Sequence, residues 1–182
     1  MIEAFVGLGS NLGDRLANLA AALEALAREP AFSFRRASTA WESEPVGPPQ
    51  PRYLNAVVQV GTVLSPRATL RKLQEIEEAL GRVRRERWGS REIDLDLLLF
   101  GDRAVQQTGL QIPHPLLHTR AFALAPLAEI SPEARHPGLS RTVSELLAAL
   151  PEAERAQVRP FRPIRLPLPE VERDGEPAQR EP

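Results

Sequence analysis

The chain has 182 residues, of which 42% are hydrophobic, and a formal net charge of −1 at pH 7. Its length favours one domain with one substantial core, and its near-neutral charge gives no global attraction to nucleic acid or a membrane. Cysteine is absent, which excludes disulfides, thiolate metal sites and cysteine nucleophiles and mildly favours a cytoplasmic location.

The chain begins with a strand pattern and then a helix pattern. Residues 2–8 form a short apolar run typical of a buried strand and lack the basic start of a signal peptide. Asn11 is the expected cap of the following helix, and Asp14 suits its positive end. The helix is expected to end near Arg28, because leucines repeat at helical spacing: Leu16, Leu19, Leu23 and Leu26.

The next segment predicts two strands and a second helix. Residues 32–41 alternate loosely, as in a strand, and residues 53–63 are rich in strand-forming types. Between them, residues 44–51 contain four prolines in eight positions and must form a loop. A helix is expected to start at Pro66 and to stop at Gly81.

The remaining chain predicts one more strand and two helices. Residues 93–100 (IDLDLLLF) form the strand, and Gly101 with Asp102 gives a hairpin-type turn. Residues 119–130 predict a helix, and Thr142 to Glu145 has the spacing of a capping box.

The expected order is strand, helix, strand, strand, helix, strand. This order matches the ferredoxin-like β-α-β-β-α-β sandwich, an α+β fold in which helices pack on an antiparallel sheet. From Pro160 onward six of 23 residues are proline, which indicates an extended tail. We therefore expect one domain over residues 1–160 and a proline-rich tail over residues 161–182.

Two aspartates interrupt the apolar run at 93–100. Because strand side chains alternate, Asp94 and Asp96 point to one face, which Leu98 and Phe100 continue as apolar residues. Two carboxylates roughly 7 Å apart repel unless a cation lies between them. Magnesium binds carboxylate oxygens and keeps positions for phosphate oxygens. A polar strand face open to solvent is the alternative.

The segment before this strand, residues 81–91, has five arginines in eleven positions. The planar guanidinium group suits phosphate oxygens. An acidic pair beside a basic loop therefore predicts magnesium and nucleotide chemistry, although a solvated charged face is the ordinary alternative.

Other residues are weaker candidates. Tyr53 and Asn55 share a strand face and could stack on and hydrogen-bond a flat heterocycle. His114 lies between two prolines and could donate to a phosphate, while Gln74 and Glu77 lie three apart on one helix face. Ordinary strand, core or helix-edge positions are the alternatives for all five.

The glycine-rich start superficially suggests a phosphate cradle at Gly7, Gly9 and Gly13. It fails the dinucleotide template, which needs glycine where this chain has Leu12, and no lysine follows for a P-loop. A tight strand-to-helix turn is the expected role.

Together, four motifs resemble the 6-hydroxymethyl-7,8-dihydropterin pyrophosphokinase family of folate biosynthesis: GLGSNLGD, EPVGPPQPRYLNAVV, GRVRRERWGSREIDLDLLLFG and IPHPLLHTRAFALAPLAEI. The resemblance runs from residue 1 to about 150, and the third motif is the most specific. It implies an ATP-dependent enzyme that moves pyrophosphate from ATP to the hydroxymethyl group of the pterin and releases AMP.

The resemblance also implies roles for individual residues. Asp94 and Asp96 would hold two magnesium ions that bridge the ATP phosphates, and Arg82 and Arg91 would be catalytic. The ATP side would be lined by Gln74, Glu77, Arg84, Arg87, Trp88, His114 and Arg120. The pterin would be bound by Ser43, Val46, Tyr53, Asn55 and Phe122. The chain departs from some members at Gly109 and Pro115, where they carry arginine and tyrosine.

Two other functions fit parts of the pattern. A non-enzymatic ferredoxin-like module for RNA or a nucleotide suits the fold and the basic loop, but the net charge of −1 and the few aromatic residues disfavour it. A nucleotidyltransferase would use the same aspartates and differ in the phosphorus attacked. We expect a cytoplasmic monomer that binds small molecules rather than nucleic acid or a membrane.

Overall fold

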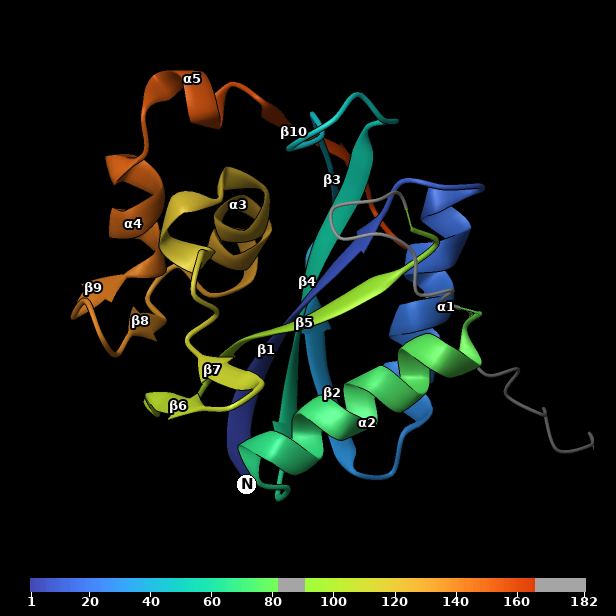
Figure 1. Cartoon of the computed structure of the whole chain (residues 1–182), viewed down its shortest axis with the longest axis vertical. Helices are drawn as coiled ribbons and strands as arrows, with labels where there is room; N and C mark the ends of the chain where they lie inside the picture. Colours follow the sequence, from blue (N-terminus) through green and yellow to red (C-terminus); the bar gives the residue numbers. More distant parts are fainter. Residues whose placement is uncertain (82–90, 166–182) are drawn as a thin grey trace, which may run out of the picture.

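The structure, a computed structural model, describes residues 1–81 and 91–165. An antiparallel sheet of six strands forms its centre, in the order β10-β3-β4-β1-β5 with β2 paired to β4 beside β3. Figure 1 shows the long central strands crossing the molecule. The strands are β1 (Ile2–Ser10), β2 (Phe32–Ala37), β3 (Ala40–Ser43), β4 (Tyr53–Thr62), β5 (Asp94–Phe100) and β10 (Val158–Arg162).

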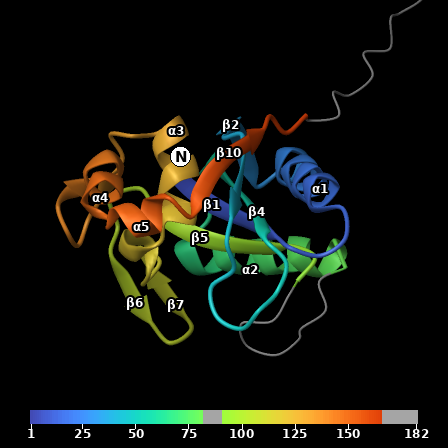
Figure 2. The same cartoon turned by 90° about the horizontal axis from the view of Figure 1, so that it is seen from above.

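Helices cover both faces of this sheet. The helices α1 (Arg15–Arg28) and α2 (Pro66–Ala79) pack on one face, whereas α3 (Ala121–Ile130) and α4 (Val143–Ala149) lie on the other side (Figures 1 and 2). The predicted α+β ferredoxin-like arrangement is confirmed, with a further helical layer. Among the described residues, no helix is long and apolar enough to cross a membrane.

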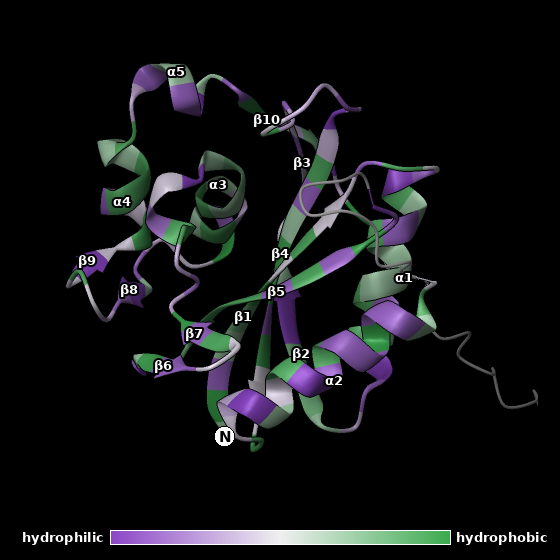
Figure 3. Cartoon of the chain, in the orientation of Figure 1, coloured by the Kyte–Doolittle hydropathy of each residue, from purple (hydrophilic) through white to green (hydrophobic). Residues whose placement is uncertain are grey.

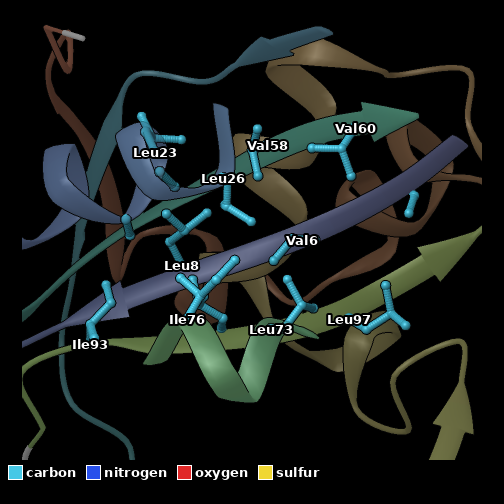
Figure 4. Close-up of a cluster of buried hydrophobic side chains, with 14 of the residues drawn as sticks. Val6, Leu8, Leu23, Leu26, Val58, Val60, Leu73, Ile76, Ile93 and Leu97 are labelled. Atoms are coloured by element: carbon cyan, nitrogen blue, oxygen red, sulfur yellow. The ribbon is translucent and has the colours of Figure 1, made fainter. Parts of the chain in front are cut away.

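Two apolar clusters hold these layers together. The first joins β1 and β4 to α1 and α2, through side chains such as Val6, Val58, Leu26 and Leu73 (Figure 4). The second lies under α3, which is mostly hydrophobic, whereas α1 and α2 carry both residue types (Figure 3). Burying one such aliphatic side chain contributes about 1.5–3 kcal/mol, so the sheet is fixed from both faces.

The start of α1 differs from the sequence expectation. Asp14, not Asn11, is the N-cap, because its side-chain oxygen accepts the backbone N–H of Ala17 at 3.0 Å. The capping box at α4 is confirmed, since Thr142 and Glu145 exchange side-chain to backbone hydrogen bonds.

The strand predicted over residues 32–41 is interrupted in its middle. Ser38 directs its backbone N–H to the carbonyl of Val57, and its hydroxyl accepts the N–H of Val57 at 3.0 Å. The chain therefore continues along the same edge of β4 as two strands, β2 and β3, rather than one.

The C-terminal expectation is also corrected in part. Residues 160–162, which the proline content assigned to an extended tail, lie in β10, and Arg162 pairs with Ala40 of β3. A proline is tolerated there because β10 is the edge strand of the sheet.

The remaining elements are short. Gly101 has a positive φ of 54°, as a turn requires, but β5 does not pair with the strand that follows it. The small elements are β6 (Val105–Gln107), β7 (Leu110–Ile112), the 3-10 turn η1 (Leu117–Thr119), β8 (Arg135–His136), β9 (Arg141–Thr142) and α5 (Glu152–Arg155).

Candidate active site

The register of the sheet lays the predicted site residues across three strands. Gly9 of β1 pairs with Asn55 of β4 on one side and with Asp94 of β5 on the other. Gly7 pairs with Asp96 in the same way. Since directly paired residues share a face, the carboxylates and the Asn55 amide lie on the same face, separated by two glycines.

The two glycines form the floor between these groups. A Cβ at Gly9 would lie 3.6 Å from Asn55 Oδ1, and one at Gly7 would lie 3.3 Å from Leu98 Cδ1. Because glycine has no side chain, this part of the face stays open. Both glycines lie within β1, not in the strand-to-helix turn that the sequence predicted. Only Gly13, with a φ of 62°, lies in that turn.

The alternation of β5 places the carboxylates as predicted. Asp94 and Asp96 are half-buried, whereas Leu95 and Leu97 are buried on the opposite face. The expectation that Phe100 continues the aspartate face is wrong. The pairing with β1 shifts by one residue between Phe5 and Val6, and Phe100 packs into the α1–α2 cluster.

Two arginines lie beside the carboxylates. Arg91 Nη1 lies 2.6 Å from Asp94 Oδ2 in an ion pair. Burial lowers the pKa of Arg120, and the charges of Asp96 and Asp94 oppose this shift. The Arg120 guanidinium also lies 5.4 Å from the centre of the Phe122 ring. The site thus holds two carboxylates and two guanidinium groups, as bound phosphate and a cation require.

Tyr53 lies within the same electrostatic environment. Burial raises the pKa of its hydroxyl; the Arg91 charge opposes this shift and the Asp94 charge adds to it. The hydroxyl donates to Gln50 Oε1 at 3.3 Å. The predicted ring-binding residue therefore lies beside the Arg91–Asp94 pair.

The other residues predicted to bind the ring lie near Tyr53 or on a neighbouring element. Asn55 Nδ2 donates to the hydroxyl of Ser43 at 2.9 Å, and both residues are buried. Val46 is 56% exposed in the loop after β3. Phe122, near the start of α3, is partly buried against the second apolar cluster. The Asn55 amide, the Ser43 hydroxyl and Tyr53 thus lie together, whereas Phe122 is linked to the site through the Arg120 guanidinium.

His114 is neutral at pH 7. Burial is the main cause that lowers its pKa to about 4, the Arg120 charge acts in the same direction, and Asp94 opposes them. His114 Nδ1 accepts the backbone N–H of Leu116 at 3.2 Å, which leaves the ring proton on Nε2. The neutral ring can therefore donate one hydrogen bond.

Gln74 and Glu77 differ in their surroundings although they are close on α2. Gln74 is exposed, whereas Glu77 is 3% exposed and accepts the backbone N–H of Leu95 at 2.5 Å. Glu77 therefore fixes the edge of β5 next to the aspartates. The remaining predicted residues, Arg82, Arg84, Arg87 and Trp88, lie outside the described residues.

Asn11 and Gln50 are the residues that sequence reasoning missed. Asn11 is 2% exposed, and its Oδ1 accepts the backbone N–H of Arg91 at 2.9 Å. Its Nδ2 donates to Gln50 Oε1 at 3.0 Å and to the Pro51 carbonyl at 3.2 Å. Local sequence carries no signal for these contacts, because the partners lie far away in the chain.

The aspartates have the donor chemistry that magnesium needs. In the part of the chain that is described, no group of three or more His, Asp or Glu side chains could hold a metal. An ion on Asp94 and Asp96 would therefore complete its coordination with water or phosphate oxygens, which is how magnesium is usually bound.

Comparison with known proteins identifies the family of this chain. The profile of the family "7,8-dihydro-6-hydroxymethylpterin-pyrophosphokinase (HPPK)" matches residues 5–132. A Synechocystis protein is 44% identical over 144 residues, covering 79% of this chain and 74% of its own length. One from Haemophilus influenzae is 40% identical over 161 residues, covering 88% of this chain and all of its own length. Both are named 2-amino-4-hydroxy-6-hydroxymethyldihydropteridine pyrophosphokinase.

Comparison with solved structures finds the same fold in proteins whose titles name HPPK. The structure titled "Plasmodium falciparum HPPK-DHPS wild type with STZ-DHP" superposes with a TM-score of 0.66 over 81% of this chain. It is 16% identical, and this chain spans 43% of its length, so it supports the fold alone. On the family profile and these sequence relatives, the chain belongs to the 7,8-dihydro-6-hydroxymethylpterin-pyrophosphokinase family.

Proposed function

We propose that this chain transfers pyrophosphate from ATP to the hydroxymethyl group of 6-hydroxymethyl-7,8-dihydropterin. The hydroxymethyl oxygen attacks the β-phosphorus and loses its proton, and the bond from that phosphorus to the α-phosphate oxygen breaks, so that AMP leaves. The observation that carries this proposal is the register that sets Asp94 and Asp96 across two glycines from Asn55.

The carboxylates and arginines serve the phosphate end of the reaction. We assign Asp94 and Asp96 as holders of magnesium, with two ions, which when bound neutralise phosphate charge and orient the attacking and leaving oxygens. Arg91, paired with Asp94, is assigned to the charge that develops on the transferred group. Arg82 is assigned the same role from the family resemblance.

The pterin end is assigned to the residues on the other side of the glycine floor. Tyr53 and Phe122 would contact the two faces of the ring, and Asn55 would read its edge. Ser43 supports this assignment, since its hydroxyl already accepts from Asn55 Nδ2. Val46 would contribute from the exposed loop.

The nucleotide is assigned to the residues around Arg120 and α2. Arg120, half-buried and within electrostatic reach of both aspartates, would contact phosphate, and the neutral His114 would donate from Nε2. The other residues assigned to ATP are Gln74, Glu77, Arg84, Arg87 and Trp88.

We also propose that residues 1–160, together with the end of β10 up to Arg162, act as the catalytic domain, followed by a proline-rich tail to residue 182, in a cytoplasmic monomer. The net charge of −1 supports small-molecule substrates rather than nucleic acid or a membrane.

One assay tests the reaction directly. The protein is incubated with ATP, magnesium and the pterin alcohol, and the nucleotides are separated. AMP as the only nucleotide product, matched by pterin diphosphate, supports pyrophosphate transfer. ADP or free pyrophosphate as the product would contradict it. No turnover, together with measurable RNA binding in a separate titration, would favour the non-enzymatic module.

A further inference from the structure

Glu42 of β3 is a buried carboxylate with three arginine partners. It is 8% exposed, and its Oε1 lies 3.2 Å from Arg15 Nη1 of α1. Its Oε2 lies 3.6 Å from Arg52 Nη1 and accepts from Arg159 of β10, whose Nε is 3.2 Å away. Arg159 is the largest cause that lowers the pKa of Glu42. The carboxylate is therefore charged and joins three segments of the chain.

These contacts lie at the base of the loop between β3 and β4, which we call the 44–52 loop. Arg52 Nη2 pairs with Glu44 Oε1 at 2.6 Å, so the first and last residues of the loop are joined. Arg15 also donates to the Arg52 carbonyl at 2.9 Å. Both ends of the loop are thus tied to the Glu42 carboxylate or to its partners.

The loop ends directly at residues assigned to the pterin. Ser43 immediately precedes the loop and Tyr53 immediately follows it, and the two pair across β3 and β4. A shift at the base of the loop would therefore move the hydroxyl that orients Asn55 and the ring of Tyr53.

The strand β10 adds the last part of this arrangement. It pairs Val158 with Ser43 and Arg159 with Glu42, and the carbonyl of Gln157 accepts the N–H of Glu44 at 3.3 Å. This strand lies outside residues 5–132, the range that the family profile matches. A C-terminal segment beyond that range is thus joined to the base of the 44–52 loop.

We propose that Arg159 is a positioning residue for pterin binding, which acts through Glu42 to hold the base of the 44–52 loop. The inference rests on the proposed function, because it assumes that Ser43, Tyr53 and Asn55 bind the ring. Its physical basis is that a buried carboxylate is costly unless its charge is paired and hydrogen-bonded. Without the Arg159 side chain, Glu42 keeps Arg15 and Arg52, and β10 keeps its backbone pairing with β3. The strand therefore stays folded, while the loop base loses its side-chain link to β10.

The test uses the full chain with Arg159→Gln, Arg159→Lys and the control Arg162→Gln. Arg162 lies on the same strand, but its guanidinium stacks on the Phe161 ring at 4.8 Å. We expect Arg159→Gln to weaken pterin binding about 5- to 10-fold, equal to about 1–1.4 kcal/mol, with ATP binding changed less than about twofold. Arg159→Lys should recover part of the loss, and Arg162→Gln should match the wild type.

Hydrogen exchange of the ligand-free protein separates this inference from the proposed function. Arg159→Gln should speed amide exchange in the 44–52 loop and leave α2 unchanged. Equal loss of both affinities, or unchanged exchange in the loop, would overturn the positioning role. Faster loop exchange in a chain whose wild type binds no pterin would uphold the link from β10 to the loop and contradict the proposed function instead.

Discussion

Asn11 and Arg91, 80 residues apart in sequence, hold each other's backbone at the edge of the candidate site. Asn11 Oδ1 accepts the Arg91 N–H at 2.9 Å, and the Asn11 N–H donates to the Arg91 carbonyl at 3.2 Å. The Arg91 side chain pairs with Asp94, while the Asn11 amide group reaches Gln50, which accepts from Tyr53. One buried amide thus connects the phosphate end of the site to the pterin end.

Asn11→Asp should separate these two contacts. The carboxylate can still accept the Arg91 N–H, but it cannot donate to Gln50 or to the Pro51 carbonyl. The new carboxylate oxygen would face the oxygens of Gln50 and Pro51 with no proton between them, and loss of a hydrogen bond in this way costs about 1–3 kcal/mol. Because Gln50 also accepts from Tyr53, we expect pterin affinity to fall, by about 5- to 150-fold if this whole cost appears in binding. ATP affinity should change little. Calorimetric titration with each ligand measures both, and a loss confined to ATP would contradict the expectation.

Asp94→Asn and Asp96→Asn should each remove magnesium binding and lower turnover by at least about 100-fold, because catalysis of phosphoryl transfer depends mainly on positioning and charge neutralisation. The fold should persist, since each change removes one of two like charges on a strand face. Manganese titration, AMP release and a thermal melt test the three parts. Wild-type turnover in both variants would exclude the metal assignment.

Arg91→Ala should slow the chemical step more than it weakens ATP binding. Charge stabilisation that arises only in the transition state lowers the maximal rate and leaves ground-state affinity nearly unchanged. Loss of one such donor typically costs about 100- to 1,000-fold. The backbone bonds to Asn11 remain in this variant. Single-turnover rates beside equilibrium ATP titration decide the point, and weak binding with a normal rate would make Arg91 a simple anchor.

Phe122→Ala should weaken pterin binding roughly 5- to 150-fold, on the scale of about 1–3 kcal/mol for stacking on a base. ATP binding should be nearly unchanged. Phe122 also packs against the second apolar cluster, so a thermal melt must accompany the titration. Asn55→Ala, which removes the partner of Ser43, should have a similar selective effect. Proportionate loss of both affinities in a destabilised variant would identify Phe122 as a core residue only.

His136 should make stability depend on pH. It is 8% exposed, and burial, followed by the charge of His118, lowers its pKa below the ordinary 6.5. As the pH falls, His136 becomes protonated near pH 6.5 in the unfolded chain but only at a lower pH in the folded protein. The contribution of His136 to the free energy of unfolding should therefore fall as pH drops below 6.5, by up to about 1.4 kcal/mol per pH unit, until its folded pKa is reached.

Urea denaturation at several pH values between 7.5 and 5 measures this slope. His136→Gln should reduce it in part, because His114, whose pKa burial lowers to about 4, contributes to the slope over the same range. His118→Gln, which removes the neighbouring ring 6.1 Å away, should reduce it in part. An identical slope in all three proteins would assign the pH dependence to other groups.

The elements that depend on local pattern were predictable from the sequence. Leucines at helical spacing define α1, and the capping box starts α4, because helix formation depends on neighbours three and four residues apart. The shared face of Asp94 and Asp96 on β5 was predictable for the same reason, since side chains alternate along any strand.

Contacts between distant segments were decided only by the tertiary structure. The pairing of β1 with both neighbours turned Gly7 and Gly9 into a floor, and a one-residue shift in the same pairing moved Phe100 to the opposite face. Asn11 does not cap α1 as predicted; its side chain instead bridges Gln50 and Arg91. Such bonds depend on which backbone groups meet in space, and no pattern within a few residues of sequence encodes that meeting.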